Sequence, residues 1–581
     1  MSGAKGRSSA DNAGASWRGA WRRSRQSRTP AQHLLRADVN RRAVAKPRTR
    51  LVIVGIGFMF AAVAVQLVRL AATPRPEIVA SLTEPMAKSF ARPDIVDREG
   101  RLLATDIEMP SLYADPLLVR GVDDVAERLS LALPELNAGE LRRVLSDRNR
   151  RFIWLRRGLP PKLAQDIHNL GLPGLDFRTE LRRAYPLERL AGHLLGSVNI
   201  DNRGSGGIER AIDETVGVEP AHGSTPSTGM PVRLTIDLGV QHALEDELSA
   251  AMGRYEAKGV AGLVMDVRTG EMLAAASLPG VDPARAGEIL DPERLDKIQG
   301  STYELGSIFK IQTVAMALDS GKVKPDTVID VTKPLTAGRF TIKDLHSAGR
   351  PLTVSEVFLH SSNVGAGMLA LGEGPERQKA FLESLGLMGS MRTEVGPVAA
   401  PQQPPKFGRV EQITVSYGHG LAVAPIQYAA ATAALINGGT TITPTYMSVR
   451  APPAEAGRRV ISAETSRALC VLLRRNVAEQ AGTGRRADVP GFRVGGKTGT
   501  AEMPGRGGYQ AKSVVSSFLA AFPMDAPKYL VMIMIFEPKG TADSAGEVLA
   551  GRNAAPTAGR VIARIAPQLG IRPDGNVASL D

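Results

Sequence analysis

The chain has 581 residues, of which 43% are hydrophobic and 23% are charged, values typical of a globular protein with roughly two to four domains. Its formal net charge is +13, but residues 1–50 alone hold 13 Lys and Arg against two acidic residues, which leaves 59 basic and 57 acidic residues elsewhere. A body so close to neutral excludes the broad basic surface of a nucleic-acid-binding protein.

The first predicted element is a membrane anchor at residues 51–71. Residues 51–65 carry no polar side chain, and the apolar run continues to Val68, long enough to span a bilayer. The positive charge before it predicts a cytoplasmic tail at 1–50, with the rest of the chain in the periplasm. A cleaved signal peptide is the alternative, although its charged region is normally much shorter. The tail is either a topogenic segment or a contact for anionic lipid head groups.

Beyond the anchor, residues 72–230 form a region of short mixed elements. Residues 97–116 alternate like strands, and helical patterns cover 121–133 and 161–172. A stretch rich in Pro, Gly, Ser and Thr at 218–232 is typical of a linker and closes this region. We therefore expect a first exported domain of mixed α and β structure.

A second region, residues 231–570, opens with a long helical pattern and continues with a hairpin at 260–279. Two further apolar runs, at 513–523 and 529–538, predict a strand pair near the C-terminus, with mostly helical patterns in between. Sequence-distant hairpins around a helical block predict an α/β sandwich, in which an antiparallel sheet is flanked by helices. Residues 571–581 remain as a C-terminal tail.

Cys470 is the only cysteine, so an exported domain of this chain has no internal disulfide and depends on its core for stability. Its helical surroundings favour a buried structural role. The eight histidines are scattered and no Cys or His pair has metal-ligand spacing, so we predict no metal and no cofactor.

The chemistry is first indicated by Ser307 and Lys310, which form an S-x-x-K pattern. On a helix this spacing places both side chains on one face. A serine is a poor nucleophile unless a base is held against its hydroxyl, and a neighbouring lysine can serve as that base. The same pattern occurs at Ser2–Lys5 in the polar tail, so it is not sufficient alone.

Two more motifs follow in order. Ser361–Asn363 is an S-x-N pattern, which also occurs at Ser197–Asn199, where a helix cap would explain it. Lys497–Thr500, with the sequence K-T-G-T, precedes the predicted C-terminal strand pair, although a plain turn would also use a glycine there. The ordered set S-x-x-K, S-x-N and K-T-G is found in penicillin-binding proteins and related β-lactamases.

A consistent chemistry follows if Ser307 is the nucleophile and Lys310 is its general base. Lys310 must then be neutral, with a pKa far below about 10.4, and burial beside the ammonium of Lys497 would lower that pKa. Ser361 is predicted to relay a proton, and Asn363 to orient Lys310 and the substrate amide.

The K-T-G-T stretch is predicted to bind substrate. Thr498 and Thr500, with Lys497, would hold a terminal carboxylate, and Gly499 belongs to the same binding stretch. The backbone N–H groups of Ser307 and Thr500 would form an oxyanion hole. His360 and His419 lie near the motifs, and we predict that both are structural.

The chain resembles the class B penicillin-binding proteins, which are monofunctional peptidoglycan D,D-transpeptidases, over residues 51–570. Besides the three motifs, the resemblance rests on YGHGLAVAPIQYAAA and on the first-region stretches ARPDIVDREGRLLA, RRAYPLERLAGHLLGSVN and GSGGIE. These stretches differ from class A relatives, which carry a glycosyltransferase domain there. Leu305 and Ile308 depart from the proline and threonine common in the family, in variable surroundings of the first motif.

The resemblance implies an α/β multidomain protein with a single transmembrane helix, an elongated α+β pedestal of the dimerisation type at 72–230, and a serine β-lactamase-like transpeptidase domain at 231–570. It also implies fold and interface roles for nine pedestal residues: Arg92, Asp97, Arg98, Gly100, Arg183, Pro186, His193, Gly196 and Glu209.

The implied function is cross-linking of peptidoglycan stem peptides that end in D-Ala-D-Ala, through a serine acyl-enzyme and with release of D-Ala. β-Lactams would acylate Ser307 as substrate mimics. Chain length, the compact pedestal and the basic tail resemble the division type, which the family pairs with a SEDS-type membrane glycosyltransferase and other septal proteins.

Three alternatives stay open from the sequence. In the first, the chain is an elongation-type relative; in the second, it is a β-lactamase; in the third, it is a non-catalytic β-lactam sensor or divisome scaffold. A β-lactamase is disfavoured because no E-x-x-L-N pattern lies between Asn363 and Lys497, and a degenerate scaffold because no motif residue is lost.

Overall fold

The structure is a computed structural model that describes residues 54–66, 69, 90–215, 219–220, 229–337, 340–448, 457–505 and 508–574. It divides into two compact units, Met1–Glu84 and Pro85–Asp581. In the first unit, residues 54–66 form a helix with exposed side chains. No helix within the described ranges is both long and apolar enough to cross a bilayer. The predicted tail 1–50, the ends of the predicted anchor, and residues 575–581 lie outside the described residues.

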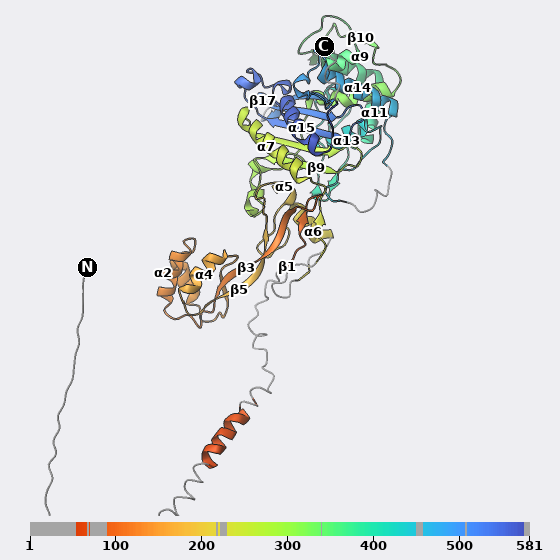
Figure 1. The fold of residues 1–581 in the computed structure, drawn as a ribbon. Helices are drawn as coiled ribbons and strands as arrows, with labels where there is room; N and C mark the ends of the chain where they lie inside the picture. The colour runs from red at the N-terminus through yellow and green to blue at the C-terminus, as the bar shows by residue number, and fades with distance from the viewer. Residues whose placement is uncertain are drawn as a thin grey trace, which may run out of the picture. The chain divides into compact units, whose positions relative to one another are not determined.

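The pedestal is built on a long antiparallel pair, β3 (Leu102–Ala114) and β5 (Leu175–Ala184). At one end of the pair, a small core forms between the strands and three helices, because each helix turns an apolar face inward. The helices are α2 (Val122–Ala132), α3 (Ala138–Leu145) and α4 (Pro161–Asn169), and β4 (Ile153–Arg156) pairs with β3 beside them. Figure 1 shows these elements together in orange.

The other end of the pedestal holds the remaining short elements. They are β1 (Phe90–Ala91), β2 (Ile95–Val96), α5 (Gly192–Leu195), α6 (Gly207–Thr215), β6 (Glu219–Pro220) and β7 (Val232–Arg233). Strand β2 pairs with both β3 and β7, so the pedestal strands and the strand at the start of the second domain share one sheet, while β1 pairs separately with β6.

A group of buried charges, here called the pedestal ion cluster, joins these elements. Glu209 on α6 accepts hydrogen bonds from Arg92 Nε at 2.8 Å and Arg183 Nε at 2.6 Å. Asp106 on β3 accepts from Arg183 at 3.2 Å and from the backbone N–H of Arg92 at 2.8 Å. The four side chains are 0–1% exposed. Three of the residues predicted to act in the fold therefore lie in one hydrogen-bonded group.

The second domain contains a five-stranded antiparallel sheet in the order β16-β17-β18-β8-β9. It combines the two predicted hairpins, because β8 (Gly259–Asp266) and β9 (Met272–Leu278) pair with the distant strands β16 (Gly495–Gly505), β17 (Gly508–Phe522) and β18 (Tyr529–Phe536). Helices α7 (Leu238–Arg254) and α15 (Ala554–Gln568) pack against the sheet and against each other. The predicted α/β sandwich is confirmed.

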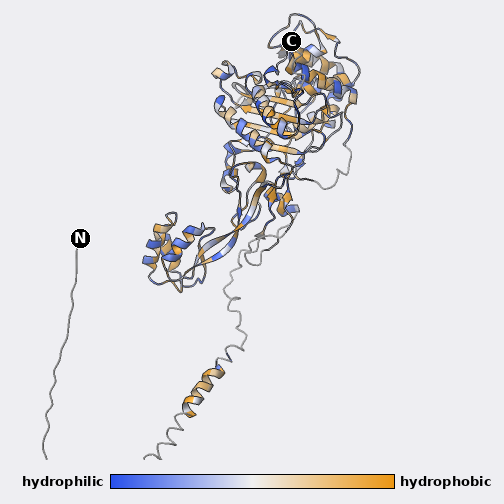
Figure 2. Ribbon diagram, in the orientation of Figure 1, coloured by the Kyte–Doolittle hydropathy of each residue, from blue (hydrophilic) through white to orange (hydrophobic). Residues whose placement is uncertain are grey.

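The helical block lies between the hairpins in sequence. Its central helix α8 (Lys310–Asp319) is buried over eight of its ten residues, so it is a core helix without a solvent face. Around it lie α9 (Val354–Leu359), α10 (Asn363–Glu373), α11 (Pro375–Ser384), α12 (Arg409–Ser416), α13 (Pro425–Ile436) and α14 (Ala463–Ala478). Figure 2 shows the apolar residues of these helices and of the sheet strands in orange.

Short strand pairs complete the block: β10 (Val328–Ile329) with β13 (Leu352–Thr353), β11 (Leu335–Ala337) with β12 (Phe340–Ile342), and β14 (Arg392–Thr393) with β15 (Gly396–Pro397). Helix α14 packs directly on the edge strand β16. This contact brings the K-T-G-T stretch beside the helical block.

Candidate active site

Ser307 and Lys310 lie where a turn of 3₁₀-helix, Gly306–Phe309, runs into α8. The Nζ atom of Lys310 is 2.8 Å from Ser307 Oγ. The same Nζ donates to the carbonyl oxygen of Ser361 at 2.6 Å and to Asn363 Oδ1 at 2.7 Å, and lies 3.1 Å from Ser361 Oγ. Lys310 is 1% exposed. The structure therefore brings together four predicted site residues around one buried nitrogen.

The hydrogen-bond partners of Lys310 suit a neutral amine. A carbonyl oxygen and an amide oxygen can only accept hydrogen bonds. In the neutral form, they take the two N–H groups of the amine and leave its lone pair directed at the hydroxyl of Ser307. The amine is then placed to remove the serine proton.

Burial also favours the neutral form. It lowers the pKa of Lys310 well below the usual lysine value, and the positive charge of Lys497 lowers it further, while Asp344 acts in the opposite direction. Burial lowers the pKa of Lys497 to about 7. In the part of the chain that the structure describes, these two buried lysines have no carboxylate in contact with them, which explains how Lys310 gives up its proton.

Ser361 occupies an unusual backbone conformation, with φ at +60°. This left-handed geometry lets one residue present both its carbonyl and its hydroxyl to Lys310. Such a conformation costs on the order of 1 kcal/mol for a non-glycine residue and persists when neighbouring contacts hold it.

Asp344 supplies those contacts and was not predicted from the sequence. Its carboxylate accepts from the N–H groups of Asn363 at 2.6 Å and Val364 at 3.0 Å, and from the hydroxyl of Ser362 at 2.6 Å. It thereby satisfies the free N–H groups at the start of α10. The S-x-N motif is fixed in place by this carboxylate.

The K-T-G-T stretch lies inside strand β16, not in a turn before it. Lys497 is 0% exposed and its Nζ lies 5.8 Å from the centre of the Phe358 ring. A Cβ added at Gly499 would lie 2.3 Å from the carbonyl oxygen of Leu305. Glycine is therefore required at this position by the close approach of two backbones and not by a turn.

Thr483 and Asn476 support this strand and were also not predicted. The hydroxyl of Thr498 donates to Thr483 Oγ1 at 2.7 Å, and Lys497 Nζ lies 3.5 Å from the same oxygen. Asn476 on α14 accepts from the backbone N–H of Thr483 at 3.2 Å and donates to the carbonyl of Gly496 at 2.8 Å. The end of α14 thus holds the first residues of β16.

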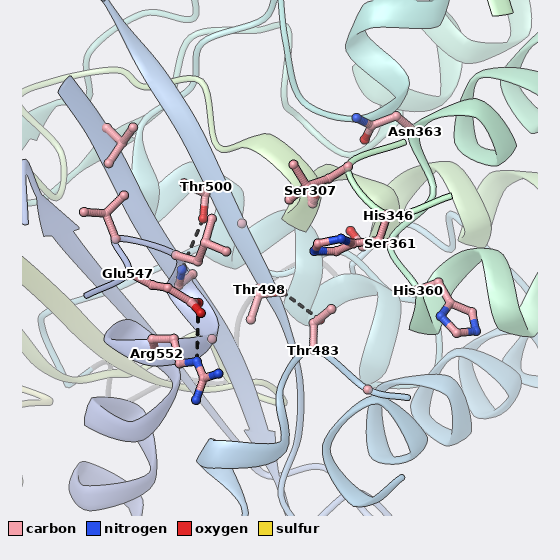
Figure 3. Close-up of a pocket in the computed structure, with 18 of the residues that line it drawn as sticks. Ser307, His346, His360, Ser361, Asn363, Thr483, Thr498, Thr500, Glu547 and Arg552 are labelled. Atoms are coloured by element: carbon pink, nitrogen blue, oxygen red, sulfur yellow. Dashed lines mark hydrogen bonds and ion pairs between the residues drawn. The ribbon is translucent and has the colours of Figure 1, made fainter. Parts of the chain in front are cut away.

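These residues open into a cleft of about 1050 Å³. Figure 3 shows Ser307, Ser361 and Asn363 on one side of it and Thr498 and Thr500 on the other. The hydroxyl of Thr500 accepts a hydrogen bond from the N–H of Ala550 at 3.2 Å. Six of the eight predicted site residues line this cleft: Ser307, Ser361, Asn363, Thr498, Gly499 and Thr500. Lys310 lies behind Ser307, within hydrogen-bond distance of its hydroxyl. Lys497 lies buried behind them.

Both predicted structural histidines line the cleft. His360 caps the C-terminal end of α9 and is exposed to solvent. His419 lies 3.1 Å from Glu304, whose other oxygen accepts from the N–H of Gly420. Their structural role remains a prediction.

Comparison with known proteins gives two family matches and several relatives. Residues 260–559 match the penicillin binding protein transpeptidase domain, and residues 88–215 match the penicillin-binding protein dimerisation domain. The chain is 41% identical to a probable peptidoglycan D,D-transpeptidase FtsI of Caulobacter vibrioides, over 83% of this chain and 82% of the relative. It is 28% identical to the peptidoglycan D,D-transpeptidase FtsI of Escherichia coli K12, over 84% and 85% of the two chains.

A crystal structure of penicillin binding protein 3 from Mycobacterium tuberculosis, complexed with aztreonam, has the same fold. Its TM-score is 0.65 at 26% sequence identity, and the match covers 84% of this chain and 98% of that one.

Proposed function

The chain belongs to the class B penicillin-binding proteins and is an FtsI-like peptidoglycan D,D-transpeptidase, and we propose that its acyl-enzyme forms on Ser307 with Lys310 as the general base. The observation that carries this assignment is the buried Lys310 Nζ, 2.8 Å from Ser307 Oγ and held by two acceptor oxygens. Relatives named FtsI support a role in septal cell-wall synthesis.

In the acylation step, Lys310 takes the proton of Ser307 as Oγ attacks the carbonyl carbon between the two D-alanines. The backbone N–H groups of Ser307 and Thr500 stabilise the oxyanion. The C–N bond then breaks, Ser361 passes a proton to the leaving D-Ala, and Asn363 keeps Lys310 oriented. The carboxylate of the donor is held by Lys497, Thr498 and Thr500, and Gly499 lets the strand approach the nucleophile.

In the second step, an amine on a neighbouring stem peptide attacks the ester and releases Ser307. A β-lactam is attacked in the same way, but its opened ring stays attached and blocks the amine. Since nothing in the motif set supplies a dedicated base for water, we expect hydrolysis of that adduct to be slow.

The experiment is labelling with a fluorescent penicillin. Wild type and Ser130→Ala, which removes a pedestal hydroxyl on α2, should label equally, whereas Ser307→Ala should not label. Persistent labelling of Ser307→Ala would contradict the nucleophile assignment. Release of D-Ala from a donor peptide in the same three proteins tests turnover.

We propose further that residues 51–71 anchor the protein in the inner membrane, with 1–50 cytoplasmic and the two domains periplasmic, beside a SEDS-type glycosyltransferase and other division proteins. The run of apolar residues after a tail of 13 Lys and Arg supports this orientation. Protease added to spheroplasts should cleave the two domains and spare an epitope placed in the tail; the opposite pattern would refute it.

Cell shape separates the division type from its alternatives. Depletion should produce filaments, whereas rounded cells would indicate the elongation type. A Ser307→Ala chain that restores division in depleted cells would support the non-catalytic scaffold instead.

A further inference from the structure

Strand β16 forms an open edge of its sheet, because β17 is its only sheet neighbour among the described strands. An open edge can pair with an extended peptide. Under the proposed function, the donor carboxylate lies by Lys497 and Thr498. A Cβ added at Gly306, next to the nucleophile, would lie 2.7 Å from the carbonyl of Thr500, so Ser307 faces the middle of the strand. The donor residues that precede D-Ala-D-Ala must therefore run past Thr500 toward Glu502.

Glu502 lies on the same face of the strand as the two threonines. Residues 498, 500 and 502 alternate with the inward-facing 497, 499 and 501, and side chains two residues apart on one face of a strand are about 6.6 Å apart. Thr498, Thr500 and Glu502 all line the cleft, and Glu502 is exposed. The carboxylate of Glu502 therefore lies two residues further along β16 than the hydroxyl of Thr500, on the same face of the strand.

No side chain that the structure describes neutralises the charge of Glu502. It makes no ion pair or side-chain hydrogen bond within the described ranges, whereas the other glutamate of the cleft wall, Glu547, pairs with Arg552 at 3.3 Å. Arginines in the cleft wall, Arg485 and Arg486, adjoin Thr483 at the carboxylate end of the strand. The cleft thus changes from basic to acidic along β16.

We propose that Glu502 is a specificity residue, which binds a positively charged group on the donor residue that precedes D-Ala-D-Ala, or on the side chain of a β-lactam that occupies the same place. This inference rests on the proposed function, which supplies the cation: stem peptides carry the amine that acts as acceptor, and donors and acceptors are stems of the same kind. An exposed carboxylate facing an ammonium is worth a few-fold in rate or affinity.

The test uses three penicillins that share a benzyl side chain and differ in the group on its α carbon. Ampicillin carries an ammonium, carbenicillin a carboxylate, and benzylpenicillin no charge. Rate constants for acylation are measured by competition with the fluorescent penicillin. Wild type should prefer ampicillin over carbenicillin. Glu502→Gln should reduce that ratio about two- to fivefold, and Glu502→Lys should invert it.

The matched control is Glu108→Gln, which neutralises an exposed glutamate on pedestal strand β3 and should leave the ratio unchanged. Raising the salt concentration should shrink the wild-type preference. An unchanged ratio in both Glu502 variants, or an equal loss with all three penicillins, would overturn the inference. Benzylpenicillin separates the role of Glu502 from the proposed function, because it carries no charge on its side chain. If wild type were not acylated by benzylpenicillin, the proposed function itself would be refuted.

Discussion

The protein buries charge in two regions with opposite consequences. In the pedestal ion cluster, the two arginines are matched by the buried carboxylates of Glu209 and Asp106, and Arg92 also pairs with Asp213, so each charge has a partner. In the transpeptidase domain, Lys310 and Lys497 are equally buried, but their hydrogen-bond partners are neutral oxygens. Compensated charges hold the fold together, whereas Lys310, buried without a contacting carboxylate among the described residues, loses its proton and becomes a reactive amine.

The largest effect expected from this difference is on catalysis. Replacing Lys310 by methionine keeps a chain of similar length and removes the base, so acylation should fall by about 10³- to 10⁴-fold. Thermal unfolding should change little, because a desolvated amine is replaced by an apolar group. The labelling rate and the melting curve are compared for one preparation. Acylation within tenfold of wild type would show that another group serves as base.

Breaking the pedestal ion cluster should lower the stability of the fold and leave acylation unchanged, the reverse of the result expected for Lys310→Met. Glu209→Gln removes the buried carboxylate that Arg92 and Arg183 share and leaves Asp213 and Asp106 as their remaining acidic partners, which should cost about 3 kcal/mol. The melting temperature of the pedestal should then fall by on the order of 10 °C, while protein that remains folded acylates normally. Glu108→Gln is the control. A melting curve like that of wild type would mean that the cluster does not contribute to stability.

The electrostatic coupling between Lys497 and Lys310 predicts that a change at Lys497 alters the pH dependence of acylation. Its positive charge lowers the pKa of Lys310, so Lys497→Met should raise that pKa and move the acid limb of the acylation profile to higher pH. At pH 7 the rate should fall about 10- to 100-fold, since a charge-assisted contact to the substrate carboxylate is also lost. Lys162→Met, on exposed pedestal surface, is the control. An acid limb that stays in place or moves to lower pH would contradict the coupling.

The smallest effect is expected for exposed charges. Arg142 pairs with Asp123 and Glu127, whose side chains are 85% and 66% exposed. Arg142→Ala should change the free energy of unfolding by less than about 1 kcal/mol. A loss as large as that of Glu209→Gln would show that burial does not explain the contrast.

Most of the catalytic machinery was predictable because each motif is short and contiguous. The hairpins were also predictable, since apolar runs around a turn are local signals. Asp344 and Thr483 were not predictable. Asp344 lies 18 residues before its partner Ser362, and Thr483 lies 15 residues before its partner Thr498. Each is in a loop, and no short motif links it to its partner. The sequence likewise did not reveal that K-T-G-T forms part of an edge strand, since its Gly499 is also typical of a turn.

The contact between Gly499 and Leu305 has a consequence for how this enzyme can acquire drug tolerance. Two main chains meet there with no room for a side chain, so no substitution at Gly499 can reshape the floor of the cleft without moving the nucleophile. Substrate and β-lactam both depend on that floor. Substitutions that lower susceptibility and preserve growth should therefore accumulate at the rim, where exposed side chains can be exchanged at small cost in stability.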